Sequence, residues 1–117
     1  MSGQVSVKVS IDEAKLAKSG QSAMKGLMKL GYDIASQARR NAPYLTGALR
    51  NTIRVQEAGT NAVEVIAGGT FGGKRVPYAW KREQGPNRNP STEHYMENAQ
   101  KQIMSGDYLK KYFGDIL

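Results

Sequence analysis

The segment Gly68–Lys74, with the sequence GGTFGGK, has the glycine and lysine spacing of a phosphate-binding P-loop and follows a predicted strand. A P-loop needs a serine or threonine after its lysine to reach Mg²⁺, but this position holds Arg75. It also needs a helix N-terminus, whereas Val76 precedes Pro77 and therefore disfavours the α conformation. Residues 69–72 also fit the GxxG clamp of KH domains, a short motif that belongs between two helices. We expect an irregular surface loop over residues 68–77 instead of a nucleotide site.

A second candidate for chemistry is His94, the only histidine of the chain, which has Glu97 one helical turn later. One imidazole and one carboxylate do not complete a metal site of three or four ligands, and the chain has no cysteine. No serine lies in a nucleophile-elbow motif, no second base is available for a triad, and no carboxylate pair lies in a recognisable catalytic motif. We therefore predict a protein that is not an enzyme and uses no cofactor or metal. His94 is expected at the surface or in an interface.

Aromatic and basic residues alternate directly after the glycine-rich stretch. Two aromatic residues and five basic ones fall within fifteen positions, namely Lys74, Arg75, Tyr78, Trp80, Lys81, Arg82 and Arg88. Such a segment can bind single-stranded nucleic acid, form a protein–protein hot spot, or pack a core behind a charged rim. The 17 basic residues exceed the 10 acidic ones and give a net charge of +7, which allows an acidic partner of either kind.

The elements that position these residues follow from the periodicity of the apolar residues. Residues 5–11 alternate Val or Ile with polar residues and predict a strand with one buried face. Residues 12–41 have a helical period. Because residues 18–22 are weak helix sequence, we favour either a late start, after Gly20, or a bend near the start of the helix. Pro43 ends this helix, Thr46 caps a short helical turn and Gly47 relieves crowding there.

The second half of the chain predicts a hairpin and two further helices. Strands around residues 53–55 and 63–67 are joined by a turn at residues 59–61. Residues 78–85 are ambiguous between strand and helix, and residues 86–90 form a loop. Residues 92–104 predict a helix, followed by a short amphipathic piece over residues 105–117. One core is expected to join Leu27, Met28, Ile34, Ala38, Leu49, Ile53, Val55, Val63 and Val65.

Residues 38–55, ARRNAPYLTGALRNTIRV, resemble the tail-completion, or head–tail joining (neck), proteins of long-tailed bacteriophages. The similarity continues in order through a Val-rich strand, a glycine-rich loop, Tyr78-Ala79, and Glu83 with Gly85, and it covers residues 5–104. Departures are the charged residues before Glu83 and Pro86 after the glycine. The matched positions expected to be architectural are Pro43, Thr46, Gly47, Leu49, Arg50, Glu83 and Gly85.

This resemblance implies an α+β fold in which a long N-terminal helix packs on a small, mostly antiparallel sheet, with a C-terminal helix, all in one domain over residues 1–117. It implies a structural virion protein that forms a ring, usually six-fold, at the head–tail junction or tail terminus. Expected partners are further copies of the chain, neighbouring neck or tail-tube proteins, and phage DNA that passes through the lumen without sequence recognition. The basic and aromatic residues would face a neighbour or the channel, and assembly would take place in the host cytoplasm. The alternative is a nucleic-acid-binding module. No apolar run is long enough to span a membrane.

Overall fold

The computed structural model describes residues 4–10, 21–42, 47–59, 62–71, 74–87, 90–106 and 108–113. Its centre is an antiparallel sheet with the strand order β1 (Val5–Ser10), β3 (Ala62–Ala67) and β2 (Arg54–Glu57). Because side chains alternate along a strand, the register places one valine from each strand side by side on one face, with Val7 opposite Val65 and Val65 opposite Val55. The other face carries polar residues such as Lys8 opposite Glu64, but Ala62 and Ile66 of β3 lie on this face as well and are buried. The apolar pattern of the sequence therefore predicted the three strands and the hairpin of β2 with β3, while the pairing of β1 with β3 comes from the structure.

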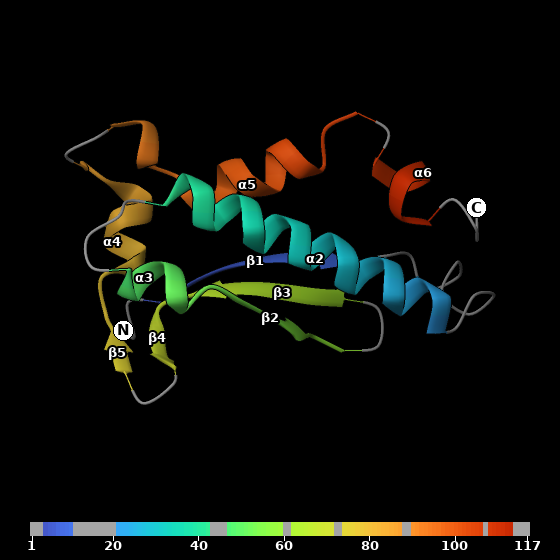
Figure 1. Ribbon diagram of the computed structural model, residues 1–117, viewed down its shortest axis with the longest axis horizontal. Helices are drawn as coiled ribbons and strands as arrows, with labels where there is room; N and C mark the ends of the chain where they lie inside the picture. The colour runs from blue at the N-terminus through green and yellow to red at the C-terminus, as the bar shows by residue number, and fades with distance from the viewer. Residues whose placement is uncertain are drawn as a thin grey trace.

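Helix α2 (Gln21–Asn41) packs across the valine face of the sheet (Figure 1). Its 21 residues correspond to a length of about 31 Å. The described helix begins at Gln21, and residues 11–20 lie outside the described part of the chain, so the expected late start stays a prediction. Leu27, Ile34 and Ala38 have no exposed surface, and they share one core with Leu49, Ile53, Val63 and Val65. The remaining two members of the expected core, Met28 and Val55, are partly buried against it.

Two C-terminal helices pack against α2 on the side of the sheet where β1 lies (Figure 1). Helix α5 (Tyr95–Ile103) buries Tyr95, Met96 and Ala99, as its helical period predicted. Helix α6 (Tyr108–Phe113) approaches α2 at Gly26, where an added Cβ would lie 2.6 Å from the carbonyl oxygen of Tyr112. The Tyr112 hydroxyl also donates a hydrogen bond to Asp33 of α2. Gly26 is therefore required for close packing between the two helices.

The outer edge of β1 is in contact with α5. The side-chain amide of Gln100 donates a hydrogen bond of 3.2 Å to the carbonyl oxygen of Lys8, and α5 contacts β1. Strand β2, at the other edge, is short, and its last two residues, Gln56 and Glu57, are exposed. Helix α5 therefore engages the outer edge of β1, while α2 contacts β2 through the valine face of the sheet.

The expected irregular loop over residues 68–77 is wrong. Strands β4 (Gly69–Phe71) and β5 (Lys74–Val76) pair antiparallel there, with Thr70 opposite Arg75. Gly68 and Gly69 adopt φ values of 86° and 74°, which L residues rarely adopt, and this lets the chain turn out of β3 into β4. The glycine-rich segment thus lies on a hairpin and does not lead into a helix N-terminus.

The remaining elements are short. Helix α3 (Ala48–Asn51) begins after Gly47, which occupies the N-cap position at φ 84° with no side-chain cap. The cap predicted for Thr46 lies outside the described residues. The ambiguous segment after residue 77 is helix α4 (Ala79–Gln84), and η1 (Pro90–Thr92) precedes α5, which begins later than the predicted residue 92. The fold is α+β with a small antiparallel sheet, and no described helix is long and apolar enough to cross a membrane.

Candidate functional site

Helix α4 presents the basic and aromatic segment of the sequence. Its inward face carries Ala79 and Glu83, which are buried. Its outward face carries Trp80 and Lys81, and the indole of Trp80 remains 47% exposed. Tryptophan side chains are highly buried on average, and tryptophan is enriched at the centres of protein interfaces, so a half-exposed indole marks a candidate contact surface.

The structure divides the other predicted residues of this segment between the core and the surface. Tyr78 is half-buried and packs against the core, so the packing interpretation holds for this ring. Arg75 is exposed on β5, and Arg82 is half-buried on α4. The side chain of Lys74 and all of Arg88 lie outside the described part. Trp80, Lys81 and Arg75 therefore remain as the described surface candidates.

Glu83 joins α4 to the beginning of α5. Its carboxylate accepts hydrogen bonds from the backbone N–H of Met96 at 2.8 Å and of Glu97 at 3.2 Å. Its own carbonyl oxygen accepts a bond of 2.7 Å from the N–H of His94. Burial raises the pKa of the Glu83 carboxyl above its ordinary 4.5, and the two backbone bonds and the nearby imidazole of His94 oppose this shift. Glu83 thus supplies the N-terminal cap that α5 lacks, because its N-cap residue His94 makes no side-chain cap bond.

Glu83, His94 and Glu97 bring ligand-type atoms within 4.8 Å of one another, which raises the question of a metal site. Both oxygens of Glu83 already accept backbone N–H bonds at a helix N-terminus, whose positive end disfavours a cation. Glu97 lies 3.6 Å from Nδ1 of His94 and also forms a 3.1 Å ion pair with Lys101. The cluster therefore fits a helix cap with an exposed ion-pair network and not a metal centre. His94 is exposed, as predicted.

Gly85 allows the chain to pass close to the loop before α5. At φ 80°, an added Cβ would lie 2.7 Å from Cδ of Glu93. The Glu93 carboxylate accepts a 2.9 Å bond from the N–H of Asn87, and the Asn87 side chain donates to the carbonyl of Arg82 at 2.8 Å. A side chain at position 85 would disturb this connection between α4 and α5.

The described residues of the 38–55 block also have structural contacts. Leu49 is buried, and its carbonyl accepts a 2.7 Å bond from the hydroxyl of Thr52, which in turn accepts from the N–H of Gly68 at 2.8 Å. The guanidinium of Arg50 donates to the carbonyl of Ala42 at 3.1 Å, just after the end of α2. These contacts hold α3 between α2 and the sheet. Pro43 and Thr46 lie outside the described residues.

Sequence reasoning found Glu83, Gly85 and His94 separately but did not bring Glu83 and His94 together. Eleven positions separate them, and only the packing of α4 against α5 makes them neighbours. Comparison with protein-family models, curated proteins and solved structures gives no match.

Proposed function

We propose that this chain is a structural protein of a long-tailed phage particle that forms a ring at the head–tail junction or tail terminus. In this role it would complete the tail and join it to the head, without catalysis. The proposal starts from the resemblance of residues 38–55 and of the later Tyr78-Ala79 and Glu83-x-Gly85 positions to tail-completion proteins. It is supported by what the described residues at these positions do, since Leu49, Arg50 and Glu83 all make contacts that hold elements together.

The observation that carries the proposal is the outward face of α4. Trp80 is 47% exposed and has Lys81 beside it, on a helix whose inner face is anchored by Ala79 and Glu83. Tryptophan is enriched at the centres of protein interfaces. Because α4 is already fixed on the core, its backbone loses little conformational freedom when Trp80 binds a partner, and this lowers the entropic cost of binding. A closed ring needs a surface of this kind on each copy, matched to a different surface on the next copy.

The experiment is native mass spectrometry of the purified full chain. We expect a discrete ring, six-fold if the resemblance holds, and Trp80→Ser should shift the distribution toward monomers. Tyr32→Ser is the matched control, because among the described residues Tyr32 is the other exposed large aromatic residue, at 56% exposure, and lies on α2. A folded chain that stays monomeric with and without purified tail tube would contradict the proposal.

A charge-reversed variant tests the role of the basic residues in the same assembly. Arg75→Glu together with Lys81→Glu should leave the monomer folded, because both side chains are exposed. It should reduce joining of tails to heads, since charges at an interface rim mostly set encounter rate and specificity. Normal particle assembly by this variant would show that these charges do not serve the interface.

The same face also fits the alternative, a nucleic-acid-binding module. An exposed indole beside a lysine can stack on a base while the ammonium approaches a phosphate. In that case the affinity for single-stranded DNA should fall with salt, with a log–log slope of about −0.7 for each phosphate contacted. Strong salt-dependent binding by a chain that forms no ring would favour this alternative.

A further inference from the structure

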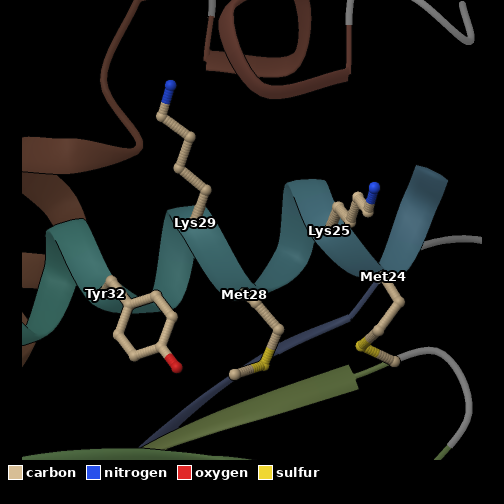
Figure 2. A pocket seen from close by; sticks show the side chains of 5 residues that line it. All are labelled: Met24, Lys25, Met28, Lys29 and Tyr32. Atoms are coloured by element: carbon tan, nitrogen blue, oxygen red, sulfur yellow. The ribbon is translucent and has the colours of Figure 1, made fainter. Parts of the chain in front are cut away.

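An apolar groove runs along one flank of α2, away from the α4 face. It has a volume of about 460 Å³ and is lined by Met24, Lys25, Met28, Lys29 and Tyr32. The two methionines are partly buried against the core, while Tyr32 is the most exposed large apolar side chain described, at 56%. Figure 2 shows both thioether groups directed toward the sheet and both lysine side chains directed the opposite way.

The lining residues form two parallel rows on one helix. Met24, Met28 and Tyr32 recur every four residues and make an apolar row, which spans about 12 Å along the helix axis. Lys25 and Lys29 make a basic row beside it, with the same spacing. Helices α5 and α6 pack on the other flank of α2, so no described helix covers these rows.

Neither lysine of the groove has an acidic partner within the described residues. The ion pairs found there join Glu97 to Lys101 and to His94, both on or beside α5. The two ammonium groups thus leave a row of positive charge next to an apolar row. A ligand that covered both rows would need acidic groups at one-turn spacing, next to apolar ones.

We propose that this groove binds an amphipathic helix of a partner protein that carries apolar side chains at one-turn spacing with Asp or Glu beside them. Methionine side chains adapt to such a partner because they are flexible and polarizable, and helix-in-groove recognition uses anchors at this spacing. The proposal does not depend on the ring function, because it rests only on the two rows of α2.

Three other occupants fit the groove less well. A second copy docked α2 against α2 would place lysine against lysine, in a chain that already has a net charge of +7. DNA would gain phosphate contacts from the lysines but would leave the thioether row without an apolar partner. A membrane surface would favour apolar groups that project outward, whereas Met24 and Met28 are recessed against the core.

The test uses the full chain with ¹³C-labelled methionine methyl groups. Met24 and Met28 report on the groove directly, and Met96, which is fully buried, is the internal control. The probe is a capped, alanine-based helical peptide with three leucines at one-turn spacing and a glutamate after each. A second peptide has lysines in place of the glutamates, and a third has serines in place of the leucines.

We expect the acidic peptide to shift the methyl signals of Met24 and Met28 and to leave that of Met96 unchanged. Lys25→Glu with Lys29→Glu should weaken its binding about tenfold or more and reverse the preference toward the lysine peptide. Lys110→Glu with Lys111→Glu, on exposed positions of α6, is the control with the same charge change and should bind like the wild type.

Four results would overturn the proposal. Equal binding of the acidic and lysine peptides would show that charge does not select the partner. If no peptide shifted the methyl signals of Met24 and Met28, the peptides would not bind in the groove. Stronger shifts with duplex DNA or with phosphatidylserine vesicles would assign the groove to those ligands. Concentration-dependent shifts of the same methyls without any peptide would assign it to a second copy.

Discussion

Replacement of Glu83 tests whether the most buried carboxylate of the described chain is a helix cap or a reactive group. Glu83 is only 5% exposed, and its two oxygens accept the N–H groups of Met96 and Glu97. Glu83→Ala removes both acceptors, while Glu83→Gln keeps the shape and one acceptor oxygen. The two variants therefore separate loss of the cap from loss of the charge.

The magnitude follows from these two bonds. Loss of a helix cap costs about 1 kcal/mol, and a buried N–H left without a partner, as at Met96, costs about 1–3 kcal/mol. Removal of the carboxylate also relieves its desolvation, which the raised pKa of Glu83 reveals. We expect the free energy of unfolding to fall by about 2–3 kcal/mol in Glu83→Ala and by about 1 kcal/mol in Glu83→Gln.

The pH dependence of this effect has a definite sign. Because the pKa of Glu83 in the folded protein lies above its ordinary value of 4.5, the folded state holds more proton than the unfolded state between these two pKa values. The contribution of Glu83 to stability is therefore complete below 4.5 and falls as the pH rises through that interval. The stability difference between the wild type and Glu83→Gln should thus be larger in mild acid than at neutral pH.

Urea unfolding at the two pH values, followed by circular dichroism, measures these differences. Glu57→Gln is the matched control, because Glu57 is exposed on β2 and should give little change. Two results would refute the reasoning. One is a Glu83→Ala variant as stable as the control, and the other is a rise of Tm with added Zn²⁺ or Mn²⁺, which would show that the cluster with His94 and Glu97 binds a metal.

Three further substitutions test the packing by urea unfolding. Gly26→Ala should destabilise by about 1–2 kcal/mol, since the clash with the Tyr112 carbonyl and the Phe113 ring outweighs the better helix propensity of Ala; a gain in stability would contradict this contact. Tyr95→Phe should cost about 1–2 kcal/mol because it leaves the Ala79 carbonyl without its 2.9 Å bond, and an unchanged midpoint would mean that water replaces the hydroxyl. Ile34→Asp, which puts a charge at a fully buried position of α2, should cost about 4 kcal/mol or more, and an unchanged melt would show that the buried face is misassigned.

The sheet and the central helix could be predicted because their signal is local. Alternating valines in residues 5–9 and 63–65 placed one face on the core, and Leu27, Ile34 and Ala38 marked the buried stripe of α2. The β4–β5 hairpin could not be predicted in this way. Its strands have only three residues each, too few to show a periodic pattern. The chain turns into the hairpin at Gly68 and Gly69, whose positive φ values leave no periodic signal in the sequence.

The contacts between distant elements could also not be predicted from the sequence. Gly26 lies away from the apolar stripe of α2, so nothing local shows that it touches α6. Glu83 and His94 carried signals of their own, a motif position and a lone histidine, but their proximity depends on how α4 meets α5. For the surface candidates, the sequence could suggest a basic and aromatic segment, whereas only packing decides that Tyr78 turns inward and Trp80 outward.

The unequal edges of the sheet constrain the symmetry of any assembly. In the described part of the three-stranded sheet, the edge at β1 is engaged by Gln100 of α5, which leaves the edge at β2 for a strand from another molecule. Pairing through β2 alone joins the β2 strands of two molecules about a two-fold axis. Both β2 edges are then occupied, so no third molecule can be added to the sheet in this way. A ring of higher order therefore cannot be built as one continuous sheet through these strands, and its subunits would have to meet through side chains on two dissimilar surfaces.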